Sequence, residues 1–379
     1  MSARPKVLVT FGTRPEAIKM FPVVNALRAE GCCEVKVVVT AQHREMLDQV
    51  MAIAGLDPDI DLDLMQHGQS LDALASRILL AFGEVLDREQ PDRVLVHGDT
   101  LTTMMVTLAC YFRRVAVGHV EAGLRSGDIY SPWPEEINRR VTGTIADLNF
   151  APTQTAADAL LRENADPANV FVTGNTVIDA LFAMRAKLAD EPGLASEIGA
   201  TLRGFSGKRI VAVTAHRREN FGQGMRNIAA ALKRLAARED VAIVYPVHPN
   251  PNVLGIMHEE LGGLANIALI EPLDYPNFVQ MMMAADLILT DSGGIQEEAP
   301  SLGKPVIVMR DTTERPEGVA AGTALLVGAE EDAIVDHASR LLDDADAYRQ
   351  VAQAHNPYGD GTAAEQIAAI VAQRHGCGT

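Results

Sequence analysis

Histidines and carboxylates occur in pairs at the ends of two neighbouring apolar segments. His97 and Asp99 end one segment, and His119 and Glu121 end the next. Alternate residues of an extended chain point to the same side, so each histidine would share a side with the carboxylate that follows it. Four such groups could bind a metal ion. Two carboxylates close together also suit acid–base work, because each raises the pKa of the other. We favour acid–base chemistry and predict no metal, since such clusters mark functional sites.

A second pair of carboxylates, Glu135 and Glu136, follows the segment Pro132-Trp133-Pro134, which holds the single tryptophan of the chain. Acidic residues at the start of a helix can serve only to offset the helix dipole. That role explains one glutamate well, but it explains the rigid proline-flanked segment less well. A functional role for this segment therefore stays open beside the structural one.

Cationic side chains gather after the first strand-like segment of the second half of the chain, in the run His216–Arg218. Two arginines and a histidine suit the binding of a phosphate group and the protonation of a leaving group. The alternative is an exposed basic loop, and we favour the functional interpretation. Arg14 and Lys19, in and after the first strand–helix turn, and Arg315 could supply further cations. His248 ends another strand-like segment and is less informative alone.

The run Asp291–Gly294 lies between an apolar segment and a short helical one. Two glycines at the start of a helix let a ligand approach the backbone, where free N–H groups and the positive end of the dipole favour an anion. Ser292 could cap this helix or donate to a phosphate oxygen. Glu298, about two turns further on, could accept hydrogen bonds from ribose hydroxyls. The pattern favours a nucleotide diphosphate over a turn without a ligand, although glycine-rich turns are weakly specific.

Two familiar phosphate-binding motifs are absent from the sequence. No glycine-rich dinucleotide fingerprint follows a strand-like segment, because the loose match at residues 359–364 has no such segment before it. A Walker-type loop is also missing. We therefore predict that the protein uses no redox cofactor and needs no other cofactor.

The elements that must position these residues alternate between strands and helices, which predicts α/β units with parallel sheets covered on both faces. The first predicted series of strands is Lys6–Phe11, Val35–Thr40, Arg93–His97, Val115–His119, Asp147–Phe150 and Val170–Thr173. The second is Arg209–Val213, Val241–Tyr245, Ile267–Ile270, Leu287–Thr290, Val306–Met309 and Ala324–Val327. We predict two doubly wound Rossmann-like domains, residues 1–173 and 174–361. Because ligands bind at the strand carboxyl ends of such sheets, we expect the active site in the interdomain cleft.

Composition limits the class of protein and its partners. The chain has 379 residues, of which 47% are hydrophobic and 22% charged, as in a soluble globular protein. Its net charge of −17 argues against nucleic acid or an anionic membrane as a partner. The first strand begins too early to leave room for a signal peptide, and no apolar run is long enough to span a membrane. The four cysteines lack metal-ligand spacing, so we expect reduced thiols and a cytoplasmic location.

Taken in order, these motifs resemble those of the non-hydrolysing UDP-N-acetylglucosamine 2-epimerases. The matching runs cover nearly the whole chain, at residues 11–20, 40–46, 97–100, 119–125, 131–136, 174–179, 216–219 and 291–298. The resemblance implies the glycosyltransferase-B architecture, with a C-terminal helix, residues 362–379, crossing back to the first domain. It also implies reversible conversion of UDP-GlcNAc to UDP-ManNAc for envelope polysaccharide synthesis, in a homodimer.

The resemblance also assigns roles to residues of this sequence. UDP would be bound by Ser292, Gly293 and Gly294 with Arg14, His216 and Arg315 at the diphosphate, Glu298 at the ribose and Phe278 at the uracil. The sugar would be faced by Lys19, Asp99, Glu121 and Glu135, and the catalytic groups would be Asp99, Glu121, Glu135 and His216. A second, activating UDP-GlcNAc site would involve Gln42, Gln69, Glu136, Arg217 and His248.

The chemistry explains why such a site needs carboxylates. The C2 hydrogen of the sugar is not acidic, but loss of UDP from C1 makes it removable by a carboxylate, giving a glycal. Three other functions share some of these features: a UDP-sugar-dependent glycosyltransferase, a hydrolysing epimerase that releases ManNAc, and a nucleotide-sugar sensor. The sequence does not say which carboxylate removes the proton and which returns it.

Overall fold

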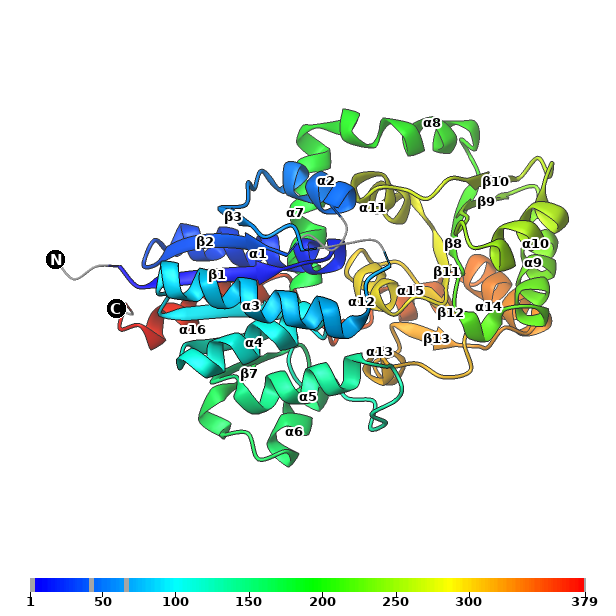
Figure 1. The fold of residues 1–379 in the computed structure, drawn as a ribbon. Helices are drawn as coiled ribbons and strands as arrows, with labels where there is room; N and C mark the ends of the chain where they lie inside the picture. Colours follow the sequence, from blue (N-terminus) through cyan, green and yellow to red (C-terminus); the bar gives the residue numbers. More distant parts are fainter. Residues whose placement is uncertain (1–3, 41–43, 65–67, 378–379) are drawn as a thin grey trace. The chain divides into compact units, whose positions relative to one another are not determined.

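The protein is described by a computed structural model over residues 4–40, 44–64 and 68–377. The chain forms two compact units (Figure 1). Unit 1 is Met1–Ala180 together with Tyr358–Thr379, and unit 2 is Leu181–Pro357. The division between Ala180 and Leu181 falls inside helix α7, Thr176–Asp190, a little later in the chain than the expected boundary.

Unit 1 is built on a parallel sheet whose strand order is β3-β2-β1-β4-β5-β6-β7. Its strands are β1 Lys6–Phe11, β2 Glu34–Val39, β3 Ile60–Asp61, β4 Arg93–His97, β5 Ala116–Val120, β6 Leu148–Ala151 and β7 Val170–Val172. The helices that begin in this unit are α1 Arg14–Glu30, α2 Arg44–Ala54, α3 Leu71–Glu89, α4 Leu101–Arg113, α5 Glu135–Ile145, α6 Gln154–Arg162, α7 and α16 Ala363–Arg374.

Unit 2 repeats this arrangement with six parallel strands in the order β10-β9-β8-β11-β12-β13. They are β8 Arg209–Thr214, β9 Val241–Pro246, β10 Ile267–Ile270, β11 Leu287–Thr290, β12 Val306–Val308 and β13 Ala324–Leu326. Its other helices are α8 Ser196–Gly204, α9 Gln223–Ala236, α10 Pro251–Leu261, α11 Tyr275–Ala284, α12 Gly293–Ser301, α13 Pro316–Ala320, α14 Glu331–Asp343 and α15 Ala345–Ala352. The prediction of two doubly wound α/β units is confirmed.

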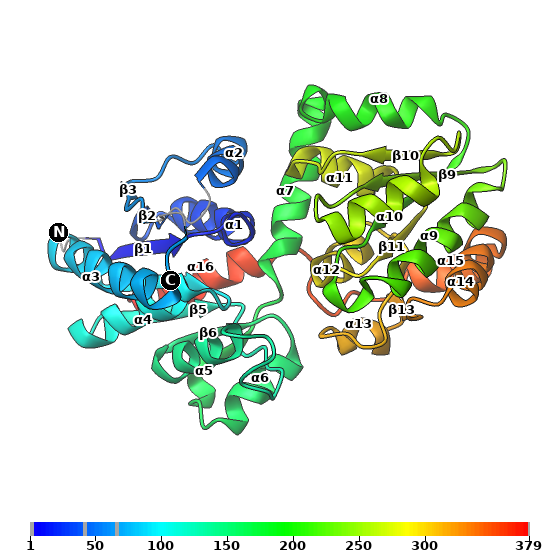
Figure 2. The same cartoon turned by 45° about the vertical axis from the view of Figure 1, so that its right-hand side comes forward.

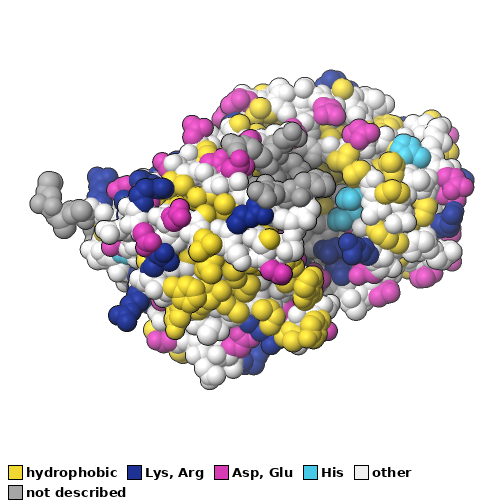
Figure 3. Space-filling model, in the orientation of Figure 1, with side chains coloured by type: hydrophobic (Ala, Val, Ile, Leu, Met, Phe, Trp, Pro, Cys, Tyr) yellow, Lys and Arg dark blue, Asp and Glu magenta, His cyan; other side chains and the backbone are white. Residues whose placement is uncertain are grey.

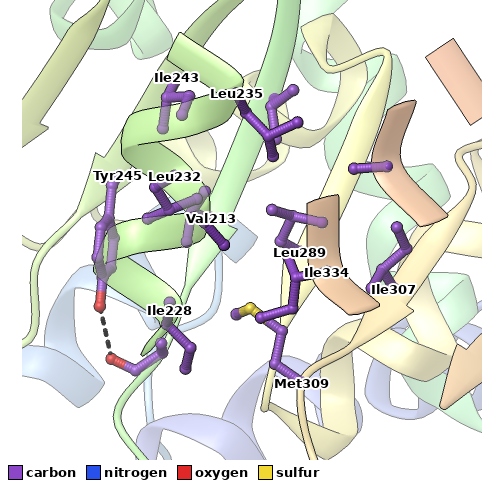
Figure 4. Close-up of a cluster of buried hydrophobic side chains, with 14 of the residues drawn as sticks. Val213, Ile228, Leu232, Leu235, Ile243, Tyr245, Leu289, Ile307, Met309 and Ile334 are labelled. Carbon is purple, nitrogen blue, oxygen red and sulfur yellow. Dashed lines mark hydrogen bonds between the residues drawn. The ribbon is translucent and has the colours of Figure 1, made fainter. Parts of the chain in front are cut away.

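The strands are continuous apolar runs because helices cover both faces of each sheet. In β1, Val7, Val9 and Phe11 join one buried cluster, whereas Leu8 joins another on the opposite face. In unit 2, Ile228, Leu232 and Leu235 repeat at the spacing of one helix face and project from α9 towards the strands (Figure 4). The same cluster holds Tyr245, whose buried hydroxyl donates to the Ala215 carbonyl at 2.8 Å.

Each sheet has its change of winding direction between the first strand and the fourth in chain order. In unit 1 this point lies between β1 and β4, and in unit 2 between β8 and β11. Loops leaving the carboxyl ends of such adjacent strands form a crevice in doubly wound sheets. The sequence-predicted residues Arg14 and Asp99 follow the first pair of strands, while His216 and Ser292 follow the second.

Helix α16 packs within unit 1 although all of unit 2 precedes it in the chain (Figure 2). Its side chains Ile367, Ala368 and Val371 share a buried cluster with residues of α1. The start of the helix is fixed by Asp179, whose Oδ1 accepts the Ala364 N–H at 2.8 Å. An aspartate in this position satisfies an N–H group that the helix itself leaves unpaired.

Three features differ from the sequence-based expectations or were missed by them. Cys32 and Cys377 form a disulfide, so the expectation that all four cysteines are reduced is wrong for this pair; Cys33 and Cys110 are buried free thiols. The polar stretch after residue 191 contains α8, which was not expected. The two-residue strand β3 was also missed. In the part of the chain that the structure describes, no helix has the length and apolar character needed to cross a membrane.

Candidate functional site

The turn between β1 and α1 places Arg14 and Lys19 and is held by the buried carboxylate of Glu16. Thr13 caps α1 in a reciprocal capping box with Glu16. The Glu16 carboxylate accepts the N–H groups of Gly12 at 3.0 Å and Thr13 at 2.8 Å, and the Thr100 hydroxyl at 2.7 Å. Burial raises the pKa of Glu16, although these hydrogen bonds act in the opposite direction. Glu16 thereby joins the turn that carries Arg14 to the start of α4.

Glu121 lies at the carboxyl end of β5 with its backbone in the left-handed region, at φ 61°. A residue other than glycine in this conformation costs free energy, which is typical of functional sites. Its carboxylate accepts a hydrogen bond from the Lys19 ammonium and another from the Asn175 amide at 3.0 Å. His97 Nε2 lies 3.7 Å from the same carboxylate oxygen. The structure therefore brings together two predicted residues, Glu121 and Lys19.

The two histidines of this region are buried and neutral. Burial lowers the pKa of His97 to about 3 and that of His119 to about 4. His119 Nε2 bonds to the Gly98 carbonyl at 2.7 Å, the backbone role that strand-end histidines often have. His119 and Asp99 thus have partners outside the predicted quartet, whereas His97 lies beside Glu121. Among residues 4–40, 44–64 and 68–377, no group of three or more His, Cys, Asp or Glu side chains is placed to hold one metal ion.

Asp99 does not share partners with Glu121 but pairs with the start of α5. Arg139 Nη2 donates to the Asp99 carboxylate at 2.6 Å, and the Asn138 amide donates to the Asp99 carbonyl at 2.8 Å. The first turn of α5 is therefore fixed against the loop after β4. This places Glu135, the first residue of α5, at the same end of the sheet as Asp99.

The neighbouring glutamates Glu135 and Glu136 have different environments. Oε2 of Glu135 is buried and has no hydrogen-bond partner among the described residues, so it could accept a hydrogen bond from a ligand. Glu136 accepts the Ser126 N–H at 3.0 Å and pairs with Arg140 at 2.9 Å. Burial alone would raise the pKa of Glu136, but these interactions outweigh it and the pKa is lowered. The carboxylate of Glu136 thus holds its own loop and helix together.

In unit 2, the buried carboxylate of Asp291 organises the loop that carries His216 and Arg217. Its Oδ2 accepts both backbone N–H groups at 2.8 Å. The His216 ring stacks on His248, with centroids 5.4 Å apart and an interplanar angle of 15°. Burial lowers the pKa of His216, and the nearby Asp291 opposes this effect. Two predicted residues from separate loops, His216 and His248, are therefore side by side.

The N-terminus of α12 has the properties expected of an anion-binding site. Ser292 precedes the helix but makes no capping hydrogen bond with its side chain, so its hydroxyl is not committed to the helix. A Cβ built on Gly293 would lie 3.9 Å from guanidinium atoms of both Arg217 and Arg315. Two cations thus flank the bare helix terminus, where N–H groups and the dipole also favour negative charge. Arg315 is held there by an ion pair with the buried Glu297.

Glu298 and Phe278 lie in the same unit, and both are half-buried. Glu298 Oε1 lies 3.5 Å from the position of a Cβ on Gly294, so it is adjacent to the start of α12. Phe278 is a half-buried residue of α11. Of the predicted second-site residues, Gln69 and Glu136 belong to unit 1, and Arg217 and His248 to unit 2. Gln42 lies outside the described residues.

Several residues that build the site were missed by the sequence analysis. Glu16, Arg139, Asn175 and Asp291 each fix a predicted residue or the loop that carries it. The spacing of Thr13 and Glu16 is that of a capping box and could have identified Glu16. Asn175 lies in the matching run at residues 174–179, but no comparable signal points to Arg139, because its partner is distant along the chain.

Comparisons with known proteins agree on one family. The family model described as UDP-N-acetylglucosamine 2-epimerase matches residues 25–372. The UDP-N-acetylglucosamine 2-epimerase of Escherichia coli (strain K12) is 54% identical over 364 residues, covering 96% of this chain and 97% of that protein. That of Bacillus subtilis (strain 168) is 50% identical over 363 residues, with 96% and 93% covered. The crystal structure of the Neisseria meningitidis enzyme bound to UDP-GlcNAc superposes with a TM-score of 0.89 at 45% identity, covering 97% of this chain and all of that one.

Proposed function

This chain belongs to the UDP-N-acetylglucosamine 2-epimerase family, and on that basis we propose that it is an isomerase that interconverts UDP-GlcNAc and UDP-ManNAc. The observation that carries the proposal is the N-terminus of α12 in unit 2, where Ser292 makes no capping bond and Arg315 lies close to Gly293, in a protein whose unit 1 has three carboxylates at one end of its sheet. A diphosphate leaving group needs an anion-binding site such as this helix N-terminus, and proton transfer at carbon needs carboxylates. Both sets must act on one molecule, since the sugar is bonded to the diphosphate.

The proposed reaction begins with cleavage of the bond between C1 and the diphosphate oxygen. The electron pair leaves with UDP, whose charge is stabilised by Ser292, Gly293 and Gly294 at the start of α12 and by Arg14 and Arg315. The approach of the diphosphate raises the pKa of His216, which suits it to donate a proton to the departing oxygen.

Positive charge developing at C1 then makes the C2 hydrogen removable. A carboxylate takes this proton, the C–H electrons form the C1–C2 double bond, and the product is a glycal. Return of a proton to the opposite face of C2 and of UDP to C1 completes the epimerisation. The groups proposed for proton transfer are Glu121, Glu135 and Asp99, with Lys19 beside Glu121 facing the sugar. Glu298 is proposed to bind the ribose and Phe278 the uracil.

One incubation separates this function from its alternatives. UDP-GlcNAc alone is incubated with the protein in D₂O and followed by proton NMR. We expect UDP-ManNAc that carries deuterium at C2, because the proton that returns comes from a group in exchange with solvent. Free ManNAc would identify a hydrolysing epimerase, and unchanged substrate would indicate a glycosyltransferase or a sensor. UDP-ManNAc that retains protium at C2 would overturn the elimination mechanism.

We also propose a second, activating site for UDP-GlcNAc that involves Gln42, Gln69, Glu136, Arg217 and His248. Binding at such a site could favour the active conformation by its higher affinity for that state. The test is the turnover of pure UDP-ManNAc. We expect little product until traces of UDP-GlcNAc are added, and full-rate turnover without them would contradict the second site.

A homodimer is proposed from an exposed apolar face of unit 1. Leu80 on α3 and Tyr111 and Phe112 on α4 are each more than half exposed, and apolar side chains gather over these helices (Figure 3). Patches of this kind mark interaction surfaces. Arg113 and Asp87 pair with each other at 2.7 Å beside them, so the face carries both charges and suits a second copy of itself. Sedimentation should show a dimer that Phe112→Glu converts to monomer.

We also propose that the protein works in the cytoplasm and that its product is used in envelope polysaccharide synthesis.

A further inference from the structure

Asn175 is a buried polar residue that no step of the proposed reaction uses. It is 2% exposed and belongs to the motif at residues 174–179. Its amide nitrogen donates to Glu121 Oε2 at 3.0 Å. Glu121 is one of the carboxylates proposed for proton transfer at C2, so this hydrogen bond acts directly on a proposed catalytic group.

The orientation of the Asn175 amide is fixed by its other contacts. Its Oδ1 accepts the Val177 N–H at 3.1 Å, in the first turn of α7. The amide nitrogen must therefore face Glu121, because the reversed amide would direct N–H groups at the N–H of Val177. The backbone N–H of Asn175 donates to the Tyr358 carbonyl at 2.7 Å. The contacts with Val177 and Tyr358 thus fix Asn175, and its amide N–H points to Glu121 in one fixed direction.

Lys19, which also donates to Glu121, has a different character. Lysine is a flexible chain with an ammonium that has no preferred direction, and Lys19 is itself proposed to face the sugar. Its contact with Glu121 can therefore be exchanged for a contact with substrate. The Asn175 amide is fixed in place, is neutral, and stabilises the ionised form of a carboxylate. It is the partner suited to hold Glu121 ready to accept a proton.

The segment beside Asn175 fits closely against the start of the C-terminal region. Gly174 has φ 88°, and a Cβ there would lie 3.2 Å from the Tyr358 carbonyl oxygen and 3.3 Å from the Gly359 Cα. A Cβ at these distances would be crowded, and the positive φ of Gly174 also favours glycine. Because Asn175 bonds to both Tyr358 and Glu121, the position of the carboxylate depends on the seating of residues 358–359 within unit 1.

We propose that Asn175 is a positioning residue that fixes the Glu121 carboxylate, as an anion, for proton transfer and ties it to the seated Tyr358–Gly359 segment. This inference rests on the proposed function, since it assumes that Glu121 exchanges the C2 proton. Asn175 acts through Glu121 and does not touch the substrate.

The test uses a variant that separates this role from helix capping. Serine before a helix accepts the same N–H group as asparagine, so Asn175→Ser keeps the bond to Val177. It has no second branch to reach Glu121. We expect Asn175→Ser to stay folded, to keep KM for UDP-GlcNAc, and to lose kcat by on the order of 10²-fold, as misplaced catalytic groups do. Wild-type kcat in this variant would overturn the proposal.

A second variant tests the electrostatic part of the proposal. Asn175→Asp places an anion beside Glu121, so the acidic limb of the kcat/KM profile should move to higher pH by about one unit or more. The matched control is Asn266→Asp in unit 2, where the wild-type amide donates to the Ala236 and Arg238 carbonyls at 3.0 and 3.2 Å. Asn266→Asp should lower the stability of the protein but leave the acidic limb of the kcat/KM profile at its wild-type pH. An equal shift in both variants would refute a specific effect on Glu121.

A measurement without turnover keeps this inference distinct from the proposed function. Glutamate carboxyl groups are labelled with carbon-13, and the Glu121 signal is identified by its loss in Glu121→Gln. The pKa of this group should rise in Asn175→Ser, because the neutral donor is lost. An unchanged pKa would overturn the proposal whether or not the wild-type protein makes UDP-ManNAc. Failure of the wild-type protein to epimerise would count only against the proposed function.

Discussion

Glu121 and Glu135 differ in how strongly their surroundings fix them, although both are proposed to act on one sugar. Glu121 has a left-handed backbone and donors from Lys19 and Asn175. Glu135 has a buried oxygen that finds no partner in the described part of the chain. Hydrogen bonds to a carboxylate stabilise its ionised form, which suits Glu121 to act as a base. We propose that, starting from UDP-GlcNAc, Glu121 removes the C2 proton and Glu135 returns one.

Replacing either glutamate by glutamine should reveal this division of roles. Both changes keep the shape and remove proton transfer, so each should lower the rate by roughly 10²–10⁴-fold. Glu121→Gln should abolish deuterium exchange at C2. Glu135→Gln should still eliminate, and should release glycal and UDP that chromatography detects. The opposite pattern would reverse the assignment.

Glu298 provides a prediction about nucleotide binding. Glu298→Ala should weaken UDP binding by roughly 1.5–3 kcal/mol, the value of a hydrogen bond to a charged group. Titration calorimetry measures this loss, and Glu259→Ala, on an exposed part of α10, serves as the control. A folded Glu298→Ala protein with wild-type affinity would remove Glu298 from the site.

Helices α7 and α16 meet at Asp179, whose carboxyl group links the stability of this contact to pH. Burial raises the pKa of Asp179 to about 6 from its usual 3.8. Between these values the folded protein binds more protons at this group than the unfolded chain does. Its contribution to the free energy of unfolding therefore falls as the pH rises through this window, and is least favourable above pH 6.

Asp179→Asn should remove this dependence, because an amide keeps an acceptor for Ala364 without a charge to bury. Relative to the wild type, the variant should gain stability between pH 4 and pH 7, by at most roughly 3 kcal/mol. Amide hydrogen exchange in α16 measures the change within unit 1. Parallel pH dependence in the two proteins would show that Asp179 does not control this contact.

The strands were predictable from the sequence, and the contacts between loops were not. Apolar runs such as Lys6–Phe11 and Leu287–Thr290 are buried on both faces, so composition alone marks them. The two residues of β3 give too short a signal, and α8 follows a proline and a glycine that suggest a loop. Glu121, Lys19 and the start of α12 were found from residue types. The pairing of Asp99 with Arg139 depends on how α5 meets the loop after β4, which no local pattern encodes.

At the scale of the whole molecule, the disulfide joins residues 345 positions apart in the sequence. Cys32 follows α1 and Cys377 follows α16, two helices that share a buried cluster in unit 1. A cross-link of this kind lowers the entropy of the unfolded chain and typically contributes about 2–4 kcal/mol. The sequence could not reveal this pair, because its spacing has meaning only once α16 is known to return to unit 1.

Cys377→Ser should therefore lower the melting temperature of unit 1 in the absence of reductant. Scanning calorimetry with and without dithiothreitol measures the effect. Reductant should lower the wild-type temperature to that of the variant and leave the variant unchanged. If the variant melts at the same temperature as the oxidised wild type, the disulfide does not stabilise the fold.

The same bond changes how the chain carries mechanical load. Together with the backbone it closes a ring that contains all of unit 2 and most of unit 1. A pulling force applied before Cys32 and after Cys377 passes directly through the sulfur atoms and bypasses every residue of the ring. In single-molecule stretching, the oxidised protein should lengthen only by its two tails, and unit 2 should unfold under tension only after the bond is reduced.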